Sequence, residues 1–229
     1  MNESMSISHI ENPENYRDII KKVWFDVIKW GESNMRDFAW RRTDDIYRVL
    51  IAEIMLHRTK ASQVEYIYEK FIKKYPGFKS IIEAGIENIK SEIFSLGLSW
   101  RADMLYQMSE NILEKYDGNV PPDKGYLMSL PGVGSYIASA VLCFGYNLPE
   151  PVLDTNTVRV IGRIFGIKIN DSSRRSKKFE KIMKDLIEHG EPKKFSLSLI
   201  DFAARICKPN NPMCGRCPLR EVCSFGGKR

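Results

Sequence analysis

The sequence of 229 residues predicts an all-α protein, and three features of the chain support that prediction. Apolar residues recur at spacings of three and four over most of its length, as they do on one face of a helix. Good helix formers fill the positions between them. Glycine and proline divide the chain into segments of ordinary helix length, and few segments alternate as a strand does.

The first predicted helix covers residues 15–31, and its apolar stripe consists of Ile19, Ile20, Val23, Trp24, Val27 and Ile28. The same spacing predicts further helices at 45–57, 60–74, 86–95, 100–115, 135–146, 155–165, 174–188 and 194–206. Breakers mark the turns between them, namely Trp30-Gly31, Pro76-Gly77, Pro121-Pro122, Pro149-Glu150-Pro151 and Gly190-Glu191-Pro192.

We expect these helices to form two lobes. Residues 32–148 would make one lobe, and residues 1–31 together with 149–229 would make the other. A chain of this length can hold one or two domains, since domains run from about 50 to 250 residues. Two lobes would leave a cleft between them, which is a common place for a ligand site.

Composition and charge narrow the class of protein. No apolar stretch approaches the roughly 18 to 20 residues that cross a membrane, and the first residues lack the pattern of an export signal. We expect a soluble monomer in the cytoplasm, without a membrane partner, where cysteines stay reduced. The net charge is +6, with basic clusters that favour nucleic acid as a partner, although many such clusters are only solvated surface.

Four cysteines lie close together near the C-terminus, at Cys207, Cys214, Cys217 and Cys223. Four thiols at this spacing can converge on one centre, either a tetrahedral zinc ion or an iron–sulfur cluster. Zinc sites usually contain two Cys-x2-Cys pairs, and this stretch has one, so the spacing favours iron and sulfur without excluding zinc. A disulfide is a weaker alternative. The fifth cysteine, Cys143, sits among apolar residues and is predicted to be buried.

A tight hairpin is predicted at Leu130-Pro131-Gly132-Val133-Gly134, between a short helical piece at 126–129 and the helix that begins at Ser135. Glycines permit unusual backbone conformations, and their missing side chains let a phosphate approach the amides of Gly132, Val133, Gly134 and Ser135. The partial positive end of the second helix would then bind the phosphate. An ordinary glycine-capped turn is the alternative.

Together, this hairpin and the cysteine quartet some seventy residues later resemble the helix-hairpin-helix DNA glycosylases of the endonuclease III and MutY group. The resemblance covers about residues 30 to 225. It implies a two-lobed helical fold, a 4Fe-4S cluster held by the four cysteines, and a cleft that receives a base flipped out of double-stranded DNA. It also implies a location with the DNA in the nucleoid.

Asp154 is suited by residue type to cap the helix that follows it, and it lies above the apolar positions Val158, Ile161 and Phe165. The resemblance places the essential aspartate of the group at Asp154, where it would stabilise the positive sugar as the base leaves. It also matches Asn156 to an asparagine that would orient water or backbone. Capping alone is the alternative.

Glu53 falls on the apolar stripe of its predicted helix, so it is either paired with a buried arginine or suited to proton transfer. The resemblance matches Glu53 to a glutamate that contacts and helps activate the flipped base. It places His57 or Arg58 where a side chain fills the gap left in the DNA stack, next to basic Lys60. Lys208, beside the cysteine loop, is predicted to contact a phosphate.

Tyr136 stands where the endonuclease III type carries a nucleophilic lysine. Its presence predicts a monofunctional enzyme that leaves the DNA strand intact, although Tyr136 could also be a core aromatic. The segment Gly97-Leu98-Ser99-Trp100-Arg101-Ala102, and a chain that ends soon after Cys223, look more like thymine/uracil mismatch glycosylases than like MutY. We therefore expect excision of thymine or uracil mispaired with guanine. The alternatives are an adenine glycosylase acting opposite guanine or 8-oxoguanine, and a non-catalytic DNA-binding protein.

Overall fold

The structure is a computed structural model that describes residues 13–97 and 100–227. Within those residues it consists of helices joined by turns and loops, with no strand, so the predicted all-α class is confirmed. The α-helices are α2 (Pro13–Asn34), α3 (Ile46–Leu56), α4 (Ala61–Lys74), α5 (Phe78–Ala84), α6 (Ile86–Ile93), α7 (Trp100–Tyr116), α8 (Lys124–Ser129), α9 (Ser135–Phe144), α10 (Thr155–Phe165), α11 (Lys177–Ile187) and α12 (Pro192–Arg205).

Each predicted helix has a counterpart, and the differences lie at the ends and at one short element. The segment predicted as 174–188 begins with a 3-10 turn, η3 (Ser173–Arg175), before α11. Helix α5 was not predicted, because its seven residues are too few for a spacing of three and four to repeat. It forms nevertheless, since Phe78 and Ile81 are buried. No helix in the described part of the chain is long and apolar enough to cross a membrane.

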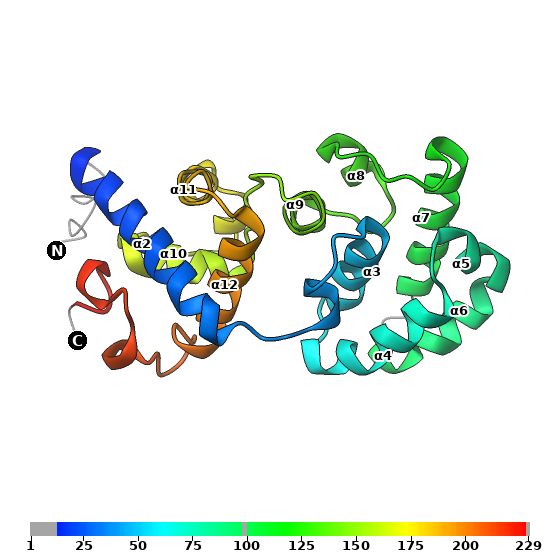
Figure 1. Cartoon of the computed structure of the whole chain (residues 1–229), viewed down its shortest axis with the longest axis horizontal. Helices are drawn as coiled ribbons and strands as arrows, with labels where there is room; N and C mark the ends of the chain where they lie inside the picture. The colour runs from blue at the N-terminus through cyan, green and yellow to red at the C-terminus, as the bar shows by residue number, and fades with distance from the viewer. Residues whose placement is uncertain (1–12, 98–99, 228–229) are drawn as a thin grey trace. The chain divides into compact units, whose positions relative to one another are not determined.

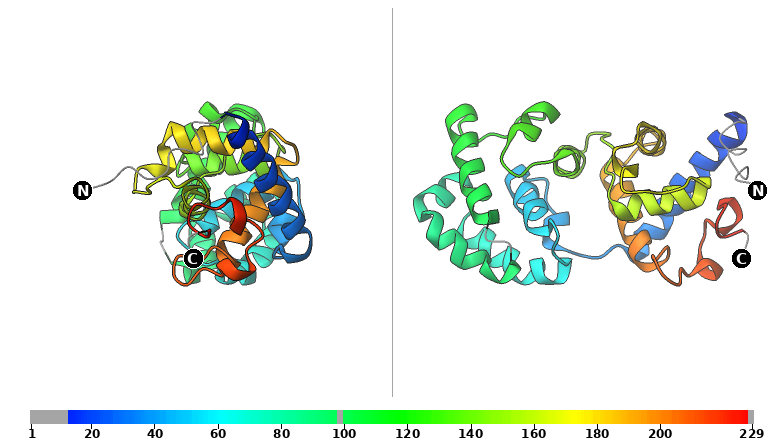
Figure 2. Two further views of the ribbon diagram at one scale, coloured as in Figure 1. Left: turned by 90° about the vertical axis from the view of Figure 1, so that its left-hand side faces the viewer. Right: turned by 180° about the vertical axis from the view of Figure 1, so that it is seen from behind.

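The chain divides into two compact units, one made of residues 1–36 and 147–229 and the other of residues 37–146. The first unit contains α2, α10, α11, α12 and the cysteine loop, residues 207–223, which runs from orange to red in Figures 1 and 2. Its core is built from the apolar faces of the four helices, including Val27, Ile161, Met183 and Phe202.

Helices α2 and α12 run side by side in the first unit (Figure 1). A Cβ atom on Gly31 would come within 2.0 Å of the Ser198 hydroxyl, so glycine permits this close approach. Because α2 comes from one end of the chain and α12 from the other, this contact unites the first unit.

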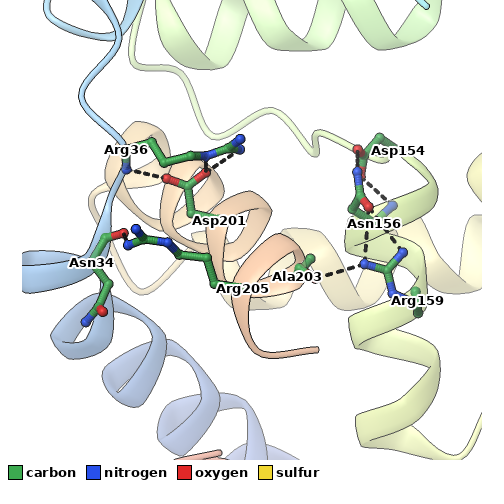
Figure 3. Close-up of polar contacts among 8 residues, drawn as sticks. All are labelled: Asn34, Arg36, Asp154, Asn156, Arg159, Asp201, Ala203 and Arg205. Atoms are coloured by element: carbon green, nitrogen blue, oxygen red, sulfur yellow. Dashed lines mark hydrogen bonds and ion pairs between the residues drawn. The ribbon is translucent and has the colours of Figure 1, made fainter. Parts of the chain in front are cut away.

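A buried ion pair fixes the point where the chain leaves the first unit. Asp201 is 0% exposed, and it accepts hydrogen bonds from the Arg36 backbone amide at 2.6 Å and from Arg36 Nε at 2.8 Å (Figure 3). Nearby, Arg205 donates to the Asn34 carbonyl at 2.7 Å. The end of α2 and the segment after it are thus attached to α12 by charge-assisted hydrogen bonds.

We expect Asp201→Ala to lower the free energy of unfolding by about 2 to 4 kcal/mol, because it removes the buried carboxylate that accepts charge-assisted hydrogen bonds from Arg36. Urea unfolding followed by circular dichroism measures the change. The matched control is Asp37→Ala, which removes an exposed pair with Arg42 at 2.6 Å and should change stability little. Equal stability of the Asp201 variant and the wild type would contradict this anchoring role.

The second unit packs α3 against α4, α7 and α9, and α5 and α6 against α7. Helix α3 is apolar over most of its surface, and Leu50, Ile51 and Met55 are buried. A helix that is apolar all round must be covered by neighbours, so α3 lies at the centre of this unit.

Candidate functional site

Asp154 is the N-cap of α10, as its residue type predicted. Its Oδ1 accepts hydrogen bonds from the backbone amides of Asn156 at 2.9 Å and Thr157 at 2.7 Å. Thr157 completes a capping box, since its hydroxyl accepts from the Asp154 amide at 2.9 Å. Only one carboxylate oxygen is needed for capping, and the partly buried side chain keeps a second oxygen for other contacts.

The second oxygen of Asp154 begins a chain of polar contacts (Figure 3). Asn156 Nδ2 donates to Asp154 Oδ2 at 2.7 Å, and Asn156 Oδ1 accepts from both terminal nitrogens of Arg159 at 3.1 Å. Arg159 also donates to the Ala203 carbonyl at 3.0 Å and, through Nε, to the Cys207 carbonyl at 2.9 Å. The carboxylate of Asp154 is therefore connected to the first cysteine of the loop.

Helix α10 also holds both ends of the cysteine loop. At the start of the loop, Arg163 donates to the carbonyls of Lys208 at 2.7 Å and Pro209 at 2.9 Å. At its end, the amides of Ser224 and Phe225 donate to carbonyls of α10 at 3.0 and 3.1 Å. One helix thus carries the Asp154 carboxylate and fixes the loop.

The four cysteines of the loop are free thiols that are partly buried. Burial, together with the charges of Cys223, Cys207 and Cys214, raises the pKa of the Cys217 thiol to about 11, although a hydrogen bond with the Leu219 backbone opposes the rise. The thiols are therefore electrostatic neighbours. Among the residues that the structure describes, no three side chains of the metal-binding types stand close enough to hold a metal ion. The loop nevertheless has the donor set of a four-cysteine centre.

The predicted hairpin is present between α8 and α9. Gly132 has φ of 77°, a conformation that favours glycine, and the Val133 amide donates to the Leu130 carbonyl at 3.1 Å. Gly134 is the N-cap of α9 and supplies no capping side chain. Val133 is buried, while Gly134 and Ser135 are exposed.

The two glycines of the hairpin, Gly132 and Gly134, differ in how much space surrounds them. A Cβ atom on Gly132 would come within 2.4 Å of Met104 Sδ, so the room is filled by Met104 of α7. Nothing lies within 4 Å of a Cβ atom on Gly134. At Gly132 the space that a side chain would take is thus filled by Met104, whereas at Gly134 it is open.

Glu53 and Tyr136 lie on the neighbouring helices α3 and α9. Glu53 is 5% exposed, which bears out its position on an apolar face. Tyr136 is partly buried in the first turn of α9. A carboxylate at this depth loses much of its hydration. It must therefore be stabilised by other protein groups or have a functional role that requires a buried carboxylate.

The basic residues predicted to meet DNA are exposed. His57, Arg58 and Lys60 follow the end of α3, and Lys208 lies in the cysteine loop. Partial burial lowers the pKa of His57, and the charges of Arg101 and Arg58 lower it further. Asp154, Asn156 and the cysteine loop belong to the first unit, and Glu53, Tyr136 and the hairpin belong to the second.

Sequence reasoning missed four residues of this region, namely Met104, Arg159, Arg163 and Arg101. A signal for the two arginines of α10 was available, since they lie four residues apart on the helix that Asp154 caps. Of the segment compared with thymine/uracil enzymes, Leu98 and Ser99 lie outside the described residues.

Comparisons with known proteins agree on one family. The sequence pattern described as "HhH-GPD superfamily base excision DNA repair protein" matches residues 51–188. A thymine/uracil-DNA glycosylase of Pyrobaculum aerophilum is 38% identical over 212 residues, covering 89% of this chain and 91% of that protein. A thymine/uracil-DNA glycosylase of Methanothermobacter thermautotrophicus is 36% identical over 200 residues, covering 87% and 90%. The solved structure of a thermostable thymine-DNA glycosylase has a TM-score of 0.88 at 34% identity, covering 93% of this chain and 99% of that one.

Proposed function

This chain belongs to the HhH-GPD superfamily of base excision DNA repair proteins, and on that premise we propose that it is a DNA glycosylase that removes thymine or uracil mispaired with guanine. The observation that carries the proposal is the carboxylate of Asp154 at the start of α10, in a chain 36 and 38% identical to two thymine/uracil-DNA glycosylases. These bases arise when 5-methylcytosine and cytosine lose an amino group. Their weak pairing with guanine lowers the cost of flipping them out of the duplex.

Asp154 stabilises the positive charge that develops on the sugar as the glycosidic bond breaks. The cap bonds to Oδ1 and the Asn156 bond to Oδ2 hold the carboxylate in one orientation. Asn156 is a positioning residue in this scheme, because it is fixed in turn by Arg159. As the bond between the sugar carbon and the base nitrogen breaks, the base takes the bonding electrons; a water molecule gives its OH to the sugar carbon, and its remaining proton balances the charge of the departing base.

Glu53 contacts the flipped base and helps activate it for departure, since a shielded carboxylate is suited to proton transfer. Tyr136 occupies the position of the lysine nucleophile in the lyase type, and a tyrosine there supplies no amine for a Schiff base. The protein therefore acts as a monofunctional enzyme that leaves an abasic strand unbroken.

The hairpin binds DNA through the backbone of Gly132, Val133, Gly134 and Ser135 at the N-terminus of α9. Exposed Lys60 and Lys208 contact phosphates, and His57 or Arg58 fills the gap in the base stack. The protein works on double-stranded DNA as a monomer.

Cys207, Cys214, Cys217 and Cys223 would hold a 4Fe-4S cluster, since their number and type match that group. When bound, the cluster would cross-link the loop. The contacts of Arg159 and Arg163 would then connect the cross-linked loop to α10.

Product analysis tests the proposal. The protein is incubated with duplexes that hold T·G, U·G, A·G or A·8-oxoguanine, and strand breaks are measured with and without alkali. We expect alkali-dependent breaks in the T·G and U·G duplexes. Breaks confined to the adenine-containing strands would replace the proposal with an adenine glycosylase, and breaks without alkali would contradict the monofunctional scheme.

A further inference from the structure

Arg101, in the first turn of α7, is a buried cation that sequence reasoning did not single out. Its side chain is 0% exposed. Two of its nitrogens, Nε and Nη1, have no hydrogen-bond partner within the described part of the chain. Burying a guanidinium in this way costs free energy, and a buried cation is usually matched by an anion. The Trp100 ring, 5.8 Å from the guanidinium carbon, offsets only part of that cost.

The remaining nitrogen of Arg101 holds the turn that follows α3. Nη2 donates to the carbonyl of His57 and, at 2.7 Å, to Thr59 Oγ1. These two acceptors flank Arg58. Because one rigid guanidinium group binds both, it sets the distance across the turn.

The turn itself has an unusual backbone, since Arg58 has φ of 61°. Residues other than glycine adopt this left-handed conformation rarely, and they keep it only where the surroundings impose it. An aromatic contact beside this turn adds to the constraint. The His57 ring packs edge-on against the ring of Trp100, the residue before Arg101, with 5.8 Å between the ring centres. The start of α7 thus holds the residues at the end of α3 in a conformation they would otherwise seldom adopt.

We propose that Arg101 is a positioning residue for base flipping, because it fixes the turn of residues 57–59 so that His57 and Arg58 can enter the DNA stack. This inference rests on the proposed function and adds a residue to it. Arg101 touches neither the base nor the sugar. Its removal should slow flipping while leaving the fold and the general attraction for DNA in place.

The test compares Arg101→Met with the wild type on a T·G duplex that carries 2-aminopurine beside the thymine. Fluorescence of 2-aminopurine rises when the neighbouring base leaves the stack. We expect Arg101→Met to slow that rise at least about tenfold, since two hydrogen bonds from a charged donor are lost. Its dissociation constant for a perfectly paired duplex should change less than about twofold, because Arg101 is shielded from phosphates. Its melting temperature should not fall, because an incompletely bonded charge is removed from the interior.

Three further variants separate positioning from folding. Arg101→Lys keeps a cation and one donor, so it should recover part of the flipping rate. Thr59→Val removes one acceptor without touching the buried charge, and it should slow flipping less than Arg101→Met does. Arg48→Met is the matched control, because Arg48 lies on α3 with its side chain 49% exposed. It should flip the base at the wild-type rate.

Wild-type flipping by a folded Arg101→Met protein would overturn the inference. If that variant does not fold, Thr59→Val decides, and an unchanged rate in Thr59→Val would overturn it as well. A different result would contradict the proposed function: a wild-type protein that unstacks the duplex but excises no base from it. The comparison of flipping rates remains valid in that case.

Discussion

Asp154→Asn is expected to lower the rate of thymine or uracil excision by about 10² to 10³-fold, the loss typical of removing one group that stabilises charge in a transition state. The introduced amide is neutral, so it cannot balance the positive charge on the sugar. Its oxygen can still accept from the amides of Asn156 and Thr157, and asparagine caps helices as well as aspartate does. Helix α10 should therefore form normally.

One local cost accompanies the Asp154 substitution. The introduced NH2 group cannot accept the hydrogen bond that Asn156 Nδ2 gives to Oδ2, so about 1 kcal/mol of stability is lost. Single-turnover excision, urea unfolding and a gel-shift assay on the same duplex separate these effects. Asp45→Asn is the matched control, because Asp45 caps α3 through a bond from the Arg48 amide at 3.2 Å. Excision by the Asp154 variant at the control's rate would remove Asp154 from the chemistry.

Local patterns predicted the helices and the position of Asp154 because each depends on neighbours in sequence. A cap needs only a side chain and the two or three amides after it, so residue type alone indicated the start of α10. The apolar neighbours of Glu53 likewise indicated its burial, which the structure confirms. Both residues could be located on their helices before any tertiary contact was known.

The residues that the sequence did not reveal act across long separations. Arg159 and Arg163 bind carbonyls of the cysteine loop more than forty positions away, and spacing along one helix says nothing about such partners. Arg101 reaches His57 across a similar distance. The sequence also did not reveal that Met104 fills the space at Gly132, because packing partners are set by the fold. Helix caps and apolar stripes can be predicted from neighbouring residues, whereas tertiary contacts can be predicted only once the arrangement of the helices is known.

Glu53→Gln is expected to slow excision by about 10² to 10⁴-fold, the usual contribution of a positioned proton-transfer group. Glutamine has the shape of glutamate and is a good helix former, so α3 should keep its packing at a residue that is 5% exposed. The substitution removes the negative charge of the side chain and its ability to take up and release a proton. Single-turnover excision on the T·G and U·G duplexes measures the loss.

The control for Glu53 is Glu65→Gln, which makes the same chemical change at an exposed position of α4. We expect wild-type excision from that variant and an unfolding midpoint close to wild type from both. A second comparison uses the double variant with Asp154→Asn. Groups that act together in one bond-breaking step lose far less in combination than their separate losses predict. Losses that multiply in full would indicate that Glu53 and Asp154 act in separate steps.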